Sequence, residues 1–175
     1  MQQPLASLAK SVAQRLERCQ RRIVFAESCT AGLISATLAR VPGISDWHCG
    51  SAVVYRCDTK TQWLGVPESI LSDPGAVSEP VARLMAVGVL DRTPEATVSA
   101  SITGHLGPGA PPDQDGLIYV GIAQRGADCQ VFERRLPAYD LSDASVPFPG
   151  DSNREVRQWA AVEFVFDLIL DTIGT

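Results

Sequence analysis

Hydrophobic positions in the first part of the chain switch between helical spacing and short continuous runs. Apolar residues recur at helical intervals over about 4–20, which predicts an amphipathic helix. Continuous apolar runs at 23–26 and 50–55 predict two buried strands. A stretch of small residues predicts a helix over about 30–40 between these strands, and the next pattern predicts a short helix at 57–64.

The rest of the chain predicts two longer helices, three strands and a glycine-proline loop. Residues 65–70 read as a turn after the short helix. The further elements are a helix over 78–91, a strand over 96–103, a loop over 104–116, strands over 117–124 and 129–136 around a turn at 125–127, a loop over 137–151 and a helix over 154–171.

The order of these elements predicts the fold class. Strands alternate with helices and then end in a hairpin, which is typical of a three-layer α/β/α sandwich with a mixed, mostly parallel sheet. One domain over residues 1–175 is expected, because no repeat or second domain is visible. Ligands of such folds bind beyond the carboxyl ends of the strands. The loops 27–32, 55–60 and 103–116 are therefore the candidate ligand-binding loops.

Composition and charge exclude several function classes. The formal net charge is −5 and there is no basic run, which argues against a nucleic-acid or anionic-membrane surface. The longest apolar segments are too short to span a bilayer, and the N-terminus lacks a signal peptide's apolar centre. Five cysteines at irregular spacing do not form a disulfide framework. Together these features indicate a reducing cytoplasm.

A metal site is not expected either. The sequence has no C-x-x-C and no H-x-x-x-H, and it holds only two histidines. Zinc ligands in proteins usually occur at such spacings. We expect His48 to be a satisfied or surface imidazole.

The segment Glu-Ser-Cys-Thr at 27–30 lies between the first strand and the helix that follows it. Serine and threonine there fit a helix cap. Ser28 is also a candidate nucleophile, because free N–H groups at a helix N-terminus stabilise developing negative charge. Cys29 competes for that role, since a helix N-terminus acidifies a thiol. A buried, inert cysteine is nevertheless the more frequent outcome.

Lysine usage points to a base. Of fifteen basic residues only Lys10 and Lys60 are lysines, and Lys60 follows a buried strand. A desolvated lysine can release its proton near neutral pH, whereas an arginine cannot. Since neither histidine lies in a triad context, a serine-lysine pair of Ser28 and Lys60 remains. Two alternatives stay open, that Lys60 is an ion-pair partner of Asp58 and that Tyr55 is a strand-end core aromatic rather than a proton carrier.

The glycine-rich loop after the third strand reads "TGHLGPGAPP". Prolines rather than a helix follow its glycines, which argues against a dinucleotide fingerprint and a Rossmann dehydrogenase. Backbone N–H groups of such a loop can still form an anion-binding nest.

Five motifs together resemble one known family. They are "AESCTAG", "VPGISDWHCGSAVVYRCDTK", "LGVPESIL", "GAVSEPVARLMAVG" and "ITGHLGPG". Their order and spacing are similar to the CinA C-terminal domain family, the nicotinamide-nucleotide amidohydrolases, in the form without the N-terminal molybdopterin-binding-like domain. The resemblance implies an α/β/α sandwich that hydrolyses nicotinamide mononucleotide to nicotinate mononucleotide and ammonia. It implies no metal and no cofactor, a pyridine nucleotide as the small-molecule partner, and a homodimer.

The resemblance also implies roles for individual residues. The family's catalytic serine, tyrosine and lysine fall on Ser28, Tyr55 and Lys60. The expected oxyanion and substrate-binding residues are Cys29, Thr30, Gly32, Thr103, Gly104, Gly107 and Arg157. Among these, backbone N–H groups at Cys29 or Thr30 would hold the oxyanion and Arg157 would meet the phosphate.

The sequence departs from the family in the glycine-rich loop. The family usually has [ST]-G-I-A-G-P-x-G-G followed by K-P-V-G. Here His105-Leu106 replaces Ile-Ala, and "DQDG" with Asp113 and Asp115 stands in place of K-P-V-G. The loss of a cation and the gain of two acids predict weaker binding of the mononucleotide, or a preference for a less anionic amide such as the riboside.

A second departure precedes the last helix, where the family tends to show G-D-R-x-x-[VI]-R. Here "GDSNREVR" keeps Asp151 and Arg157 but shifts the other arginine to Arg154. These changes leave two alternatives to the lead hypothesis. One is an amidase acting on a different amide, and the other is a catalytically silent nucleotide-binding or regulatory protein.

Overall fold

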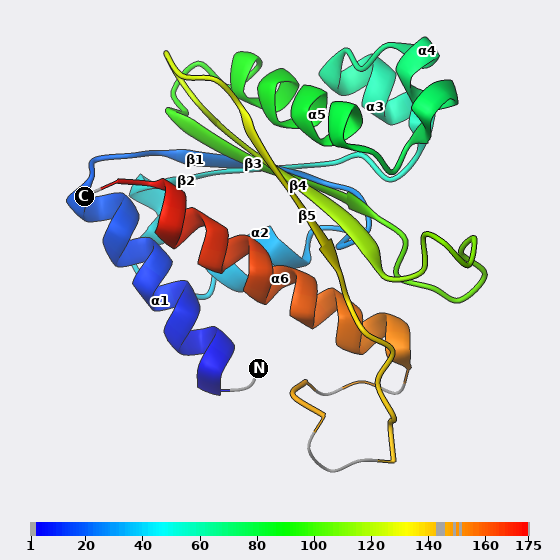
Figure 1. Cartoon of the computed structure of the whole chain (residues 1–175). Helices are drawn as coiled ribbons and strands as arrows, with labels where there is room; N and C mark the ends of the chain where they lie inside the picture. Colours follow the sequence, from blue (N-terminus) through cyan, green and yellow to red (C-terminus); the bar gives the residue numbers. More distant parts are fainter. Residues whose placement is uncertain (1–2, 143–145, 149, 151, 175) are drawn as a thin grey trace.

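A single mixed sheet organises the chain. The computed structural model describes residues 3–142, 146–148, 150 and 152–174. Within them five strands lie in the order β2-β1-β3-β4-β5 (Figure 1). Their bounds are β1 Ile23–Glu27, β2 His48–Val53, β3 Val98–Gly104, β4 Leu117–Gln124 and β5 Gln130–Arg135. β1 is parallel to both β2 and β3, whereas β4 and β5 are antiparallel additions, so the predicted mixed sheet is confirmed.

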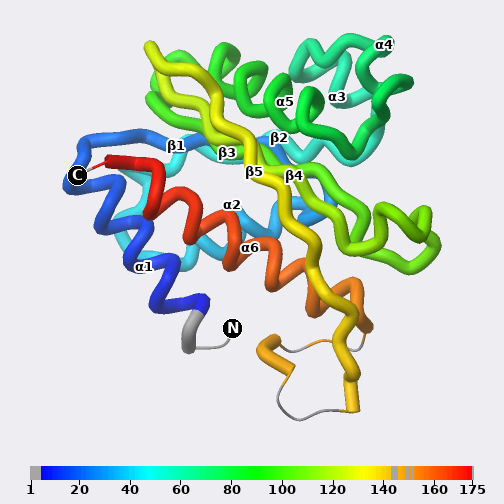
Figure 2. Tube along the Cα trace, viewed as in Figure 1, coloured from blue at the N-terminus to red at the C-terminus, as the bar shows by residue number. Residues whose placement is uncertain are grey.

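Helices cover both faces of this sheet. α1 (Gln3–Arg18), α2 (Leu33–Leu38) and α6 (Asn153–Thr172) lie on one face, and α3 (Cys57–Leu64), α4 (Glu68–Ile70) and α5 (Glu79–Asp91) lie on the other (Figures 1 and 2). The predicted three-layer sandwich is therefore confirmed. The short α4 falls in the segment 65–70 that was expected as a turn. Among the described residues, no helix has both the length and the apolar character that crossing a bilayer requires.

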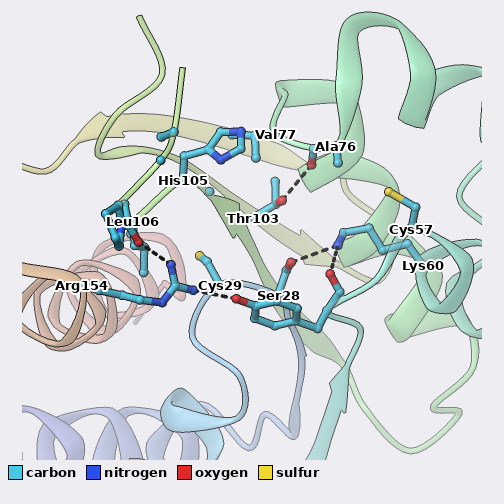
Figure 3. Close-up of a pocket in the computed structure, with 16 residues that line it drawn as sticks. Ser28, Cys29, Cys57, Lys60, Ala76, Val77, Thr103, His105, Leu106 and Arg154 are labelled. Atoms are coloured by element: carbon cyan, nitrogen blue, oxygen red, sulfur yellow. Dashed lines mark hydrogen bonds between the residues drawn. The ribbon is translucent and has the colours of Figure 1, made fainter. Parts of the chain in front are cut away.

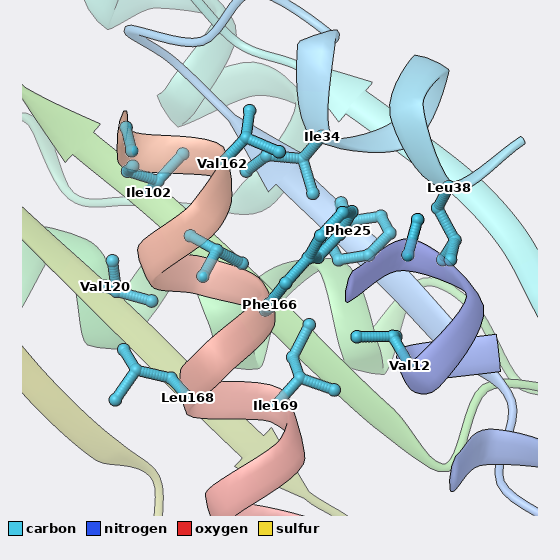
Figure 4. Packing of buried hydrophobic residues seen from close by; sticks show 14 of the residues in the cluster. Val12, Phe25, Ile34, Leu38, Ile102, Val120, Val162, Phe166, Leu168 and Ile169 are labelled. Atoms are coloured by element: carbon cyan, nitrogen blue, oxygen red, sulfur yellow. The ribbon is translucent and has the colours of Figure 1, made fainter. Parts of the chain in front are cut away.

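Alternate residues of β1 point into two separate cores. Ile23 and Phe25 pack with α1, α2 and α6, while Val24 and Ala26 pack with α5 and the residues around it. Figure 4 shows the first core, with labelled side chains that include Val12, Phe25, Ile34, Ile102, Val120 and Phe166. Each side chain of this size contributes about 1.5–3 kcal/mol when it is fully buried. A central strand fixed on both faces holds the residues that follow its carboxyl end in a defined position.

The helix that carries Lys60 packs closely on α5. A Cβ atom added at Gly88 of α5 would lie only 2.2 Å from the backbone oxygen of Leu64, the last residue of α3. A glycine at this position is thus required for the approach of the two backbones. The contact sets the distance of α3 from the sheet and hence the reach of Lys60.

Candidate active site

An open cavity of about 250 Å³ lies at the carboxyl edge of the three parallel strands (Figure 3). It is lined by Ser28 and Cys29 after β1, by residues between 55 and 60 after β2, and by residues 103–110 at the end of β3 and beyond it. Ala76, Val77 and Arg154 complete the lining. The three loops expected to bind a ligand therefore meet at one cavity, as parallel strands that end at the same edge require.

Ser28 and Lys60 are in direct contact inside this cavity. Lys60 Nζ lies 2.9 Å from Ser28 Oγ (Figure 3), and the two residues are only 2% and 8% exposed. Nζ also donates to the backbone oxygens of Val54, at 2.8 Å, and Tyr55, at 3.4 Å. Lys60 has no ion pair with Asp58 among the described residues. The alternative that Lys60 serves as an ion-pair partner of Asp58 is therefore wrong.

The surroundings of Lys60 favour its neutral form. Burial is the largest influence and lowers the pKa of the Lys60 ammonium. A neutral amine has two N–H bonds and one lone pair. The backbone oxygens of Val54 and Tyr55 can accept hydrogen bonds from the two N–H groups. The lone pair is then left for the Ser28 hydroxyl. The geometry is that of a base placed against a nucleophile.

The turn after β1 differs from the prediction. The helix expected from residue 30 begins at Leu33, because Ala31 (φ 52°) and Gly32 (φ 97°) adopt left-handed backbone conformations. Neither Ser28 nor Thr30 caps the helix, whose N-cap residue is Gly32. The expectation that Ser28 lies at a helix N-terminus is therefore wrong. Because α2 has only six residues, its dipole contributes little to the site.

Glu27 takes over the capping role that was expected of the hydroxyls. Its fully buried carboxylate accepts hydrogen bonds from the Thr30 and Ser51 hydroxyls and from the backbone N–H groups of Gly32, Ile34 and Ser35. No role was expected for Glu27 from the sequence. The available signal was an acid placed shortly before a helix, where carboxylates bind the free N–H groups of the first turn.

Replacing Glu27 with glutamine is expected to destabilise the protein by about 2 kcal/mol or more, because hydrogen bonds to charged groups contribute about 1.5–3 kcal/mol and an amide NH₂ cannot accept them. Urea unfolding of this variant measures the loss. Glu17→Gln, on the exposed side of α1, is the matched control. Equal unfolding free energies for the two variants would contradict the role given to Glu27.

Cys29 has the packing role that was expected of it. Its thiol lies in the apolar core, and burial raises its pKa to about 12, so it stays protonated at neutral pH. Its backbone N–H donates to no backbone oxygen within the described part of the chain. Thr30 does not line the cavity, and its hydroxyl donates to Glu27. Gly32 also lies outside the lining with its N–H bound to Glu27, so it shapes the turn rather than the substrate site.

Tyr55 lies at the rim of the cavity rather than in the core. Its side chain is 53% exposed, which rules out the interpretation as a core aromatic. The hydroxyl accepts a hydrogen bond from Arg154 Nη2 at 2.7 Å and forms none with Ser28 or Lys60 in the described structure. Of the side-chain groups of the expected trio, only those of Ser28 and Lys60 are thus bonded to each other among the described residues. A role of the Tyr55 hydroxyl in proton transfer stays a prediction.

The cavity arginine is Arg154, not Arg157. Arg157 is buried outside the lining and forms two hydrogen bonds with the Asp115 carboxylate, at 2.8 and 2.7 Å. This guanidinium lowers the pKa of the Asp115 carboxyl. Arg154 lines the cavity, donates to the backbone oxygen of Gly107 at 2.7 Å, and has no carboxylate within ion-pair distance among the described residues. Arg157 therefore does not line this cavity, where it was expected to meet a phosphate. Asp151 lies outside the described residues.

The glycine-rich loop lies where it was expected. Thr103, Gly104 and Gly107 line the cavity, and the Thr103 hydroxyl donates to the backbone oxygen of Ala76 (Figure 3). His105, which replaces an apolar residue of the family pattern, lines it too. Asp113 is exposed outside the lining. An effect of Asp113 on a bound phosphate therefore has no support from this geometry.

His48 is satisfied, as expected. Its Nε2 lies 2.8 Å from the Ser35 hydroxyl, and burial lowers the pKa of the imidazole. Within the residues described, no group of three or more His, Cys, Asp and Glu side chains is arranged to hold a metal ion, and all five cysteines are free. Independence from metal stays a prediction.

Comparison with known proteins decides the family. The model of the CinA C-terminal domain matches residues 5–142. The chain belongs to the CinA C-terminal domain family. A CinA-like protein of Gloeothece citriformis is 39% identical over 132 residues, which cover 74% of this chain and 31% of that protein. One of Mycobacterium sp. (strain JLS) is 45% identical over 123 residues, which cover 69% and 29%. The chain thus spans about a third of the length of these CinA-like relatives.

Solved CinA-type structures have the same architecture. The competence/damage inducible protein CihA of Agrobacterium tumefaciens superimposes with a TM-score of 0.83 at 26% identity, covering 98% of this chain and 96% of that one. A competence or damage-inducible protein of Enterobacter asburiae gives a TM-score of 0.81 at 26% identity, covering 97% and 98%. The CinA resemblance inferred from the motifs is confirmed, and so is the fold class.

Proposed function

We propose that this CinA-family chain is an amidohydrolase that releases ammonia from the carboxamide of a pyridine nucleotide, with nicotinamide mononucleotide as the first candidate. The observation that carries the proposal is the 2.9 Å contact between Lys60 Nζ and Ser28 Oγ at the bottom of a cavity. A buried lysine in a cavity, with a lowered pKa and a hydroxyl in contact, fits the pattern of a catalytic base. The resemblance of the motifs to the family's amidohydrolases supports the choice of substrate class.

The first half of the reaction forms an acyl-enzyme. As Ser28 Oγ bonds to the carboxamide carbon, its proton passes to neutral Lys60 Nζ. The resulting Lys60 ammonium protonates the departing nitrogen, the C–N bond breaks and ammonia leaves. General-base help of this kind contributes about a hundred- to ten-thousandfold in rate.

The second half returns the enzyme to its starting state. A water molecule gives one proton to Lys60 while its oxygen bonds to the ester carbon. The bond from that carbon to Ser28 Oγ then breaks, and Lys60 returns the proton to the serine oxygen. The product is the carboxylic acid, which ionises at neutral pH. Lys60 thus acts as base and acid in turn, and no further proton carrier is needed.

Two groups bind the charges that the substrate carries or develops. The backbone N–H of Cys29 donates to no backbone oxygen among the described residues and belongs to the residue that follows the nucleophile, so it is the candidate oxyanion donor. Arg154 is the lining cation without a carboxylate partner among the described residues, so it is the candidate phosphate-binding residue. Tyr55 positions Lys60 and Arg154, since its carbonyl accepts a hydrogen bond from Lys60 and its hydroxyl accepts one from Arg154.

An ammonia-release assay over a panel of amides tests the proposal. The panel contains nicotinamide mononucleotide, nicotinamide riboside, free nicotinamide and glutamine. Release from the mononucleotide or the riboside, matched by formation of the corresponding acid, supports the amidohydrolase. Release from glutamine or free nicotinamide alone points to a different amidase. No release from any of them, together with binding of the mononucleotide, points to a silent nucleotide-binding protein.

Arg154→Gln is expected to raise the KM for the mononucleotide about tenfold to a hundredfold and to leave kcat nearly unchanged, because it removes a charge-assisted bond made in both ground and transition state. The KM for the riboside, which has no phosphate, should stay the same. Arg40→Gln, on the exposed surface, is the matched control. An equal rise in KM for mononucleotide and riboside would show that Arg154 does not meet the phosphate.

Exhaustive chelation is expected to leave turnover unchanged, because the proposed steps use only the serine hydroxyl, the lysine amine and backbone groups. The measurement is ammonia release before and after dialysis against EDTA, followed by addition of zinc or manganese. Loss of activity on dialysis with recovery on adding either metal would contradict the mechanism.

A further inference from the structure

A second cavity, of about 350 Å³, adjoins the one that contains Ser28. The two share four lining residues, Leu106, Gly107, Pro108 and Arg154. Arg154 comes from α6 and the other three come from the loop after β3. A ligand that contacts Arg154 from the first cavity can therefore continue past this side chain into the second.

Apart from the shared Arg154, the described lining of the second cavity offers no free positive charge. Its other arginine, Arg157, is held by the Asp115 carboxylate and by the backbone oxygens of Leu106 and Pro137. The Arg157 side chain is only 4% exposed, whereas that of Asp115 is 43% exposed. The carboxylate thus faces the cavity with acceptor capacity to spare, and it disfavours a phosphate beside it.

The remaining lining is apolar or already bonded. Leu106, Pro108 and Ala138 supply apolar surface. The side-chain amide of Asn153 both donates to and accepts from the backbone of Tyr139. This lining suits an uncharged group that has an apolar face and hydroxyls that can donate hydrogen bonds to a carboxylate. A nucleoside has both features.

Along the two cavities lie first the Ser28–Lys60 pair, then the Arg154 cation, and last a largely apolar compartment in which the half-exposed Asp115 carboxylate can accept further hydrogen bonds. We propose that the second cavity binds the distal nucleoside of a pyridine dinucleotide, with the diphosphate at Arg154 and the carboxamide at Ser28. This inference rests on the proposed function and extends its substrate class from mononucleotides to dinucleotides. The Asp115 carboxylate accepts from the distal ribose hydroxyls, and the base packs on Leu106, Pro108 and Ala138.

Steady-state ammonia release from NAD and from nicotinamide mononucleotide tests the proposal. In the wild type, the KM for NAD should be lower than the KM for the mononucleotide by about fivefold or more, because the second nucleoside adds contacts. Ala138→Trp fills only the second cavity and should raise the KM for NAD about tenfold or more while that for the mononucleotide stays within about twofold. Ala138→Ser is the matched control, and Ala138→Leu replaces the tryptophan variant if that fails to fold. A KM for NAD no lower than that for the mononucleotide, or equal effects of Ala138→Trp on both, overturns the proposal.

Binding of ADP-ribose, measured by isothermal titration calorimetry, separates this proposal from the proposed function. ADP-ribose has the diphosphate and the distal nucleoside but no carboxamide. Binding to the wild type that Ala138→Trp weakens by about tenfold or more supports the second cavity even if no amide is hydrolysed. Absence of binding to the wild type overturns the second cavity even if the mononucleotide is hydrolysed.

Discussion

Replacing Ser28 with alanine is expected to abolish ammonia release, by about a thousandfold or more, because no acyl-enzyme can form without the attacking oxygen. Cys29→Ser should retain most of the activity, since the Cys29 thiol is buried among apolar side chains and stays protonated. The measurement is kcat/KM for the best amide of the panel.

The activities of Ser28→Ala and Cys29→Ser together decide which of the two residues is the nucleophile. If Cys29→Ser were inactive and Ser28→Ala active, the nucleophile would be the thiol and the assignment would be reversed. Thermal unfolding of both variants controls for misfolding. Misfolding is the greater concern for Cys29→Ser, because this substitution places a hydroxyl in the apolar core.

Lys60→Arg is expected to be nearly as inactive as Lys60→Ala, with a loss of about a hundred- to ten-thousandfold. Arginine keeps the positive charge but cannot release its proton near neutral pH. Lys10, the other lysine of the chain, is exposed on α1, so Lys10→Arg is the matched control and should be fully active. Substantial activity of Lys60→Arg would reduce Lys60 to an electrostatic partner.

The pH dependence of the wild type follows from the same lysine. Only the neutral amine can take the Ser28 proton, so kcat/KM should rise with pH and level off above the pKa of Lys60. Burial lowers that pKa from its usual value near 10.4. The plateau should therefore begin below that value, and a rate that still rises steeply above pH 10 would contradict a lysine with a lowered pKa.

The three layers and the mixed sheet could be predicted from the sequence because they follow from local patterns. The run Ile23-Val24-Phe25-Ala26 is apolar throughout, as a strand buried on both faces requires, and both cores use it. Alternation of such runs with helices leaves few topologies to consider. The position of the cavity followed in turn, since ligands of these folds bind beyond the carboxyl ends of the strands.

The parts of the site that were missed depend on contacts over long sequence distance or on unusual backbone conformation. Arg157 forms its ion pair with Asp115, which lies 42 residues earlier in the chain. No local pattern predicts this pair, or that Arg154 rather than Arg157 lines the cavity. Ala31 adopts a positive φ that alanine rarely takes, so the late start of α2 was not visible in its composition. Ser28 and Lys60 were found because the serine follows a strand in a small-residue turn and the lysine is rare in this chain.

Trapping of the acyl-enzyme would show which side chain is the nucleophile. Protein is quenched with acid during turnover of nicotinamide mononucleotide, digested with trypsin and examined by mass spectrometry with fragmentation. The peptide 23–40, bounded by Arg22 and Arg40, contains both Ser28 and Cys29. The account predicts an added nicotinate-mononucleotide acyl group as an ester on Ser28. An acyl group on Cys29, or an unmodified peptide while ammonia is being released in a burst, would contradict it.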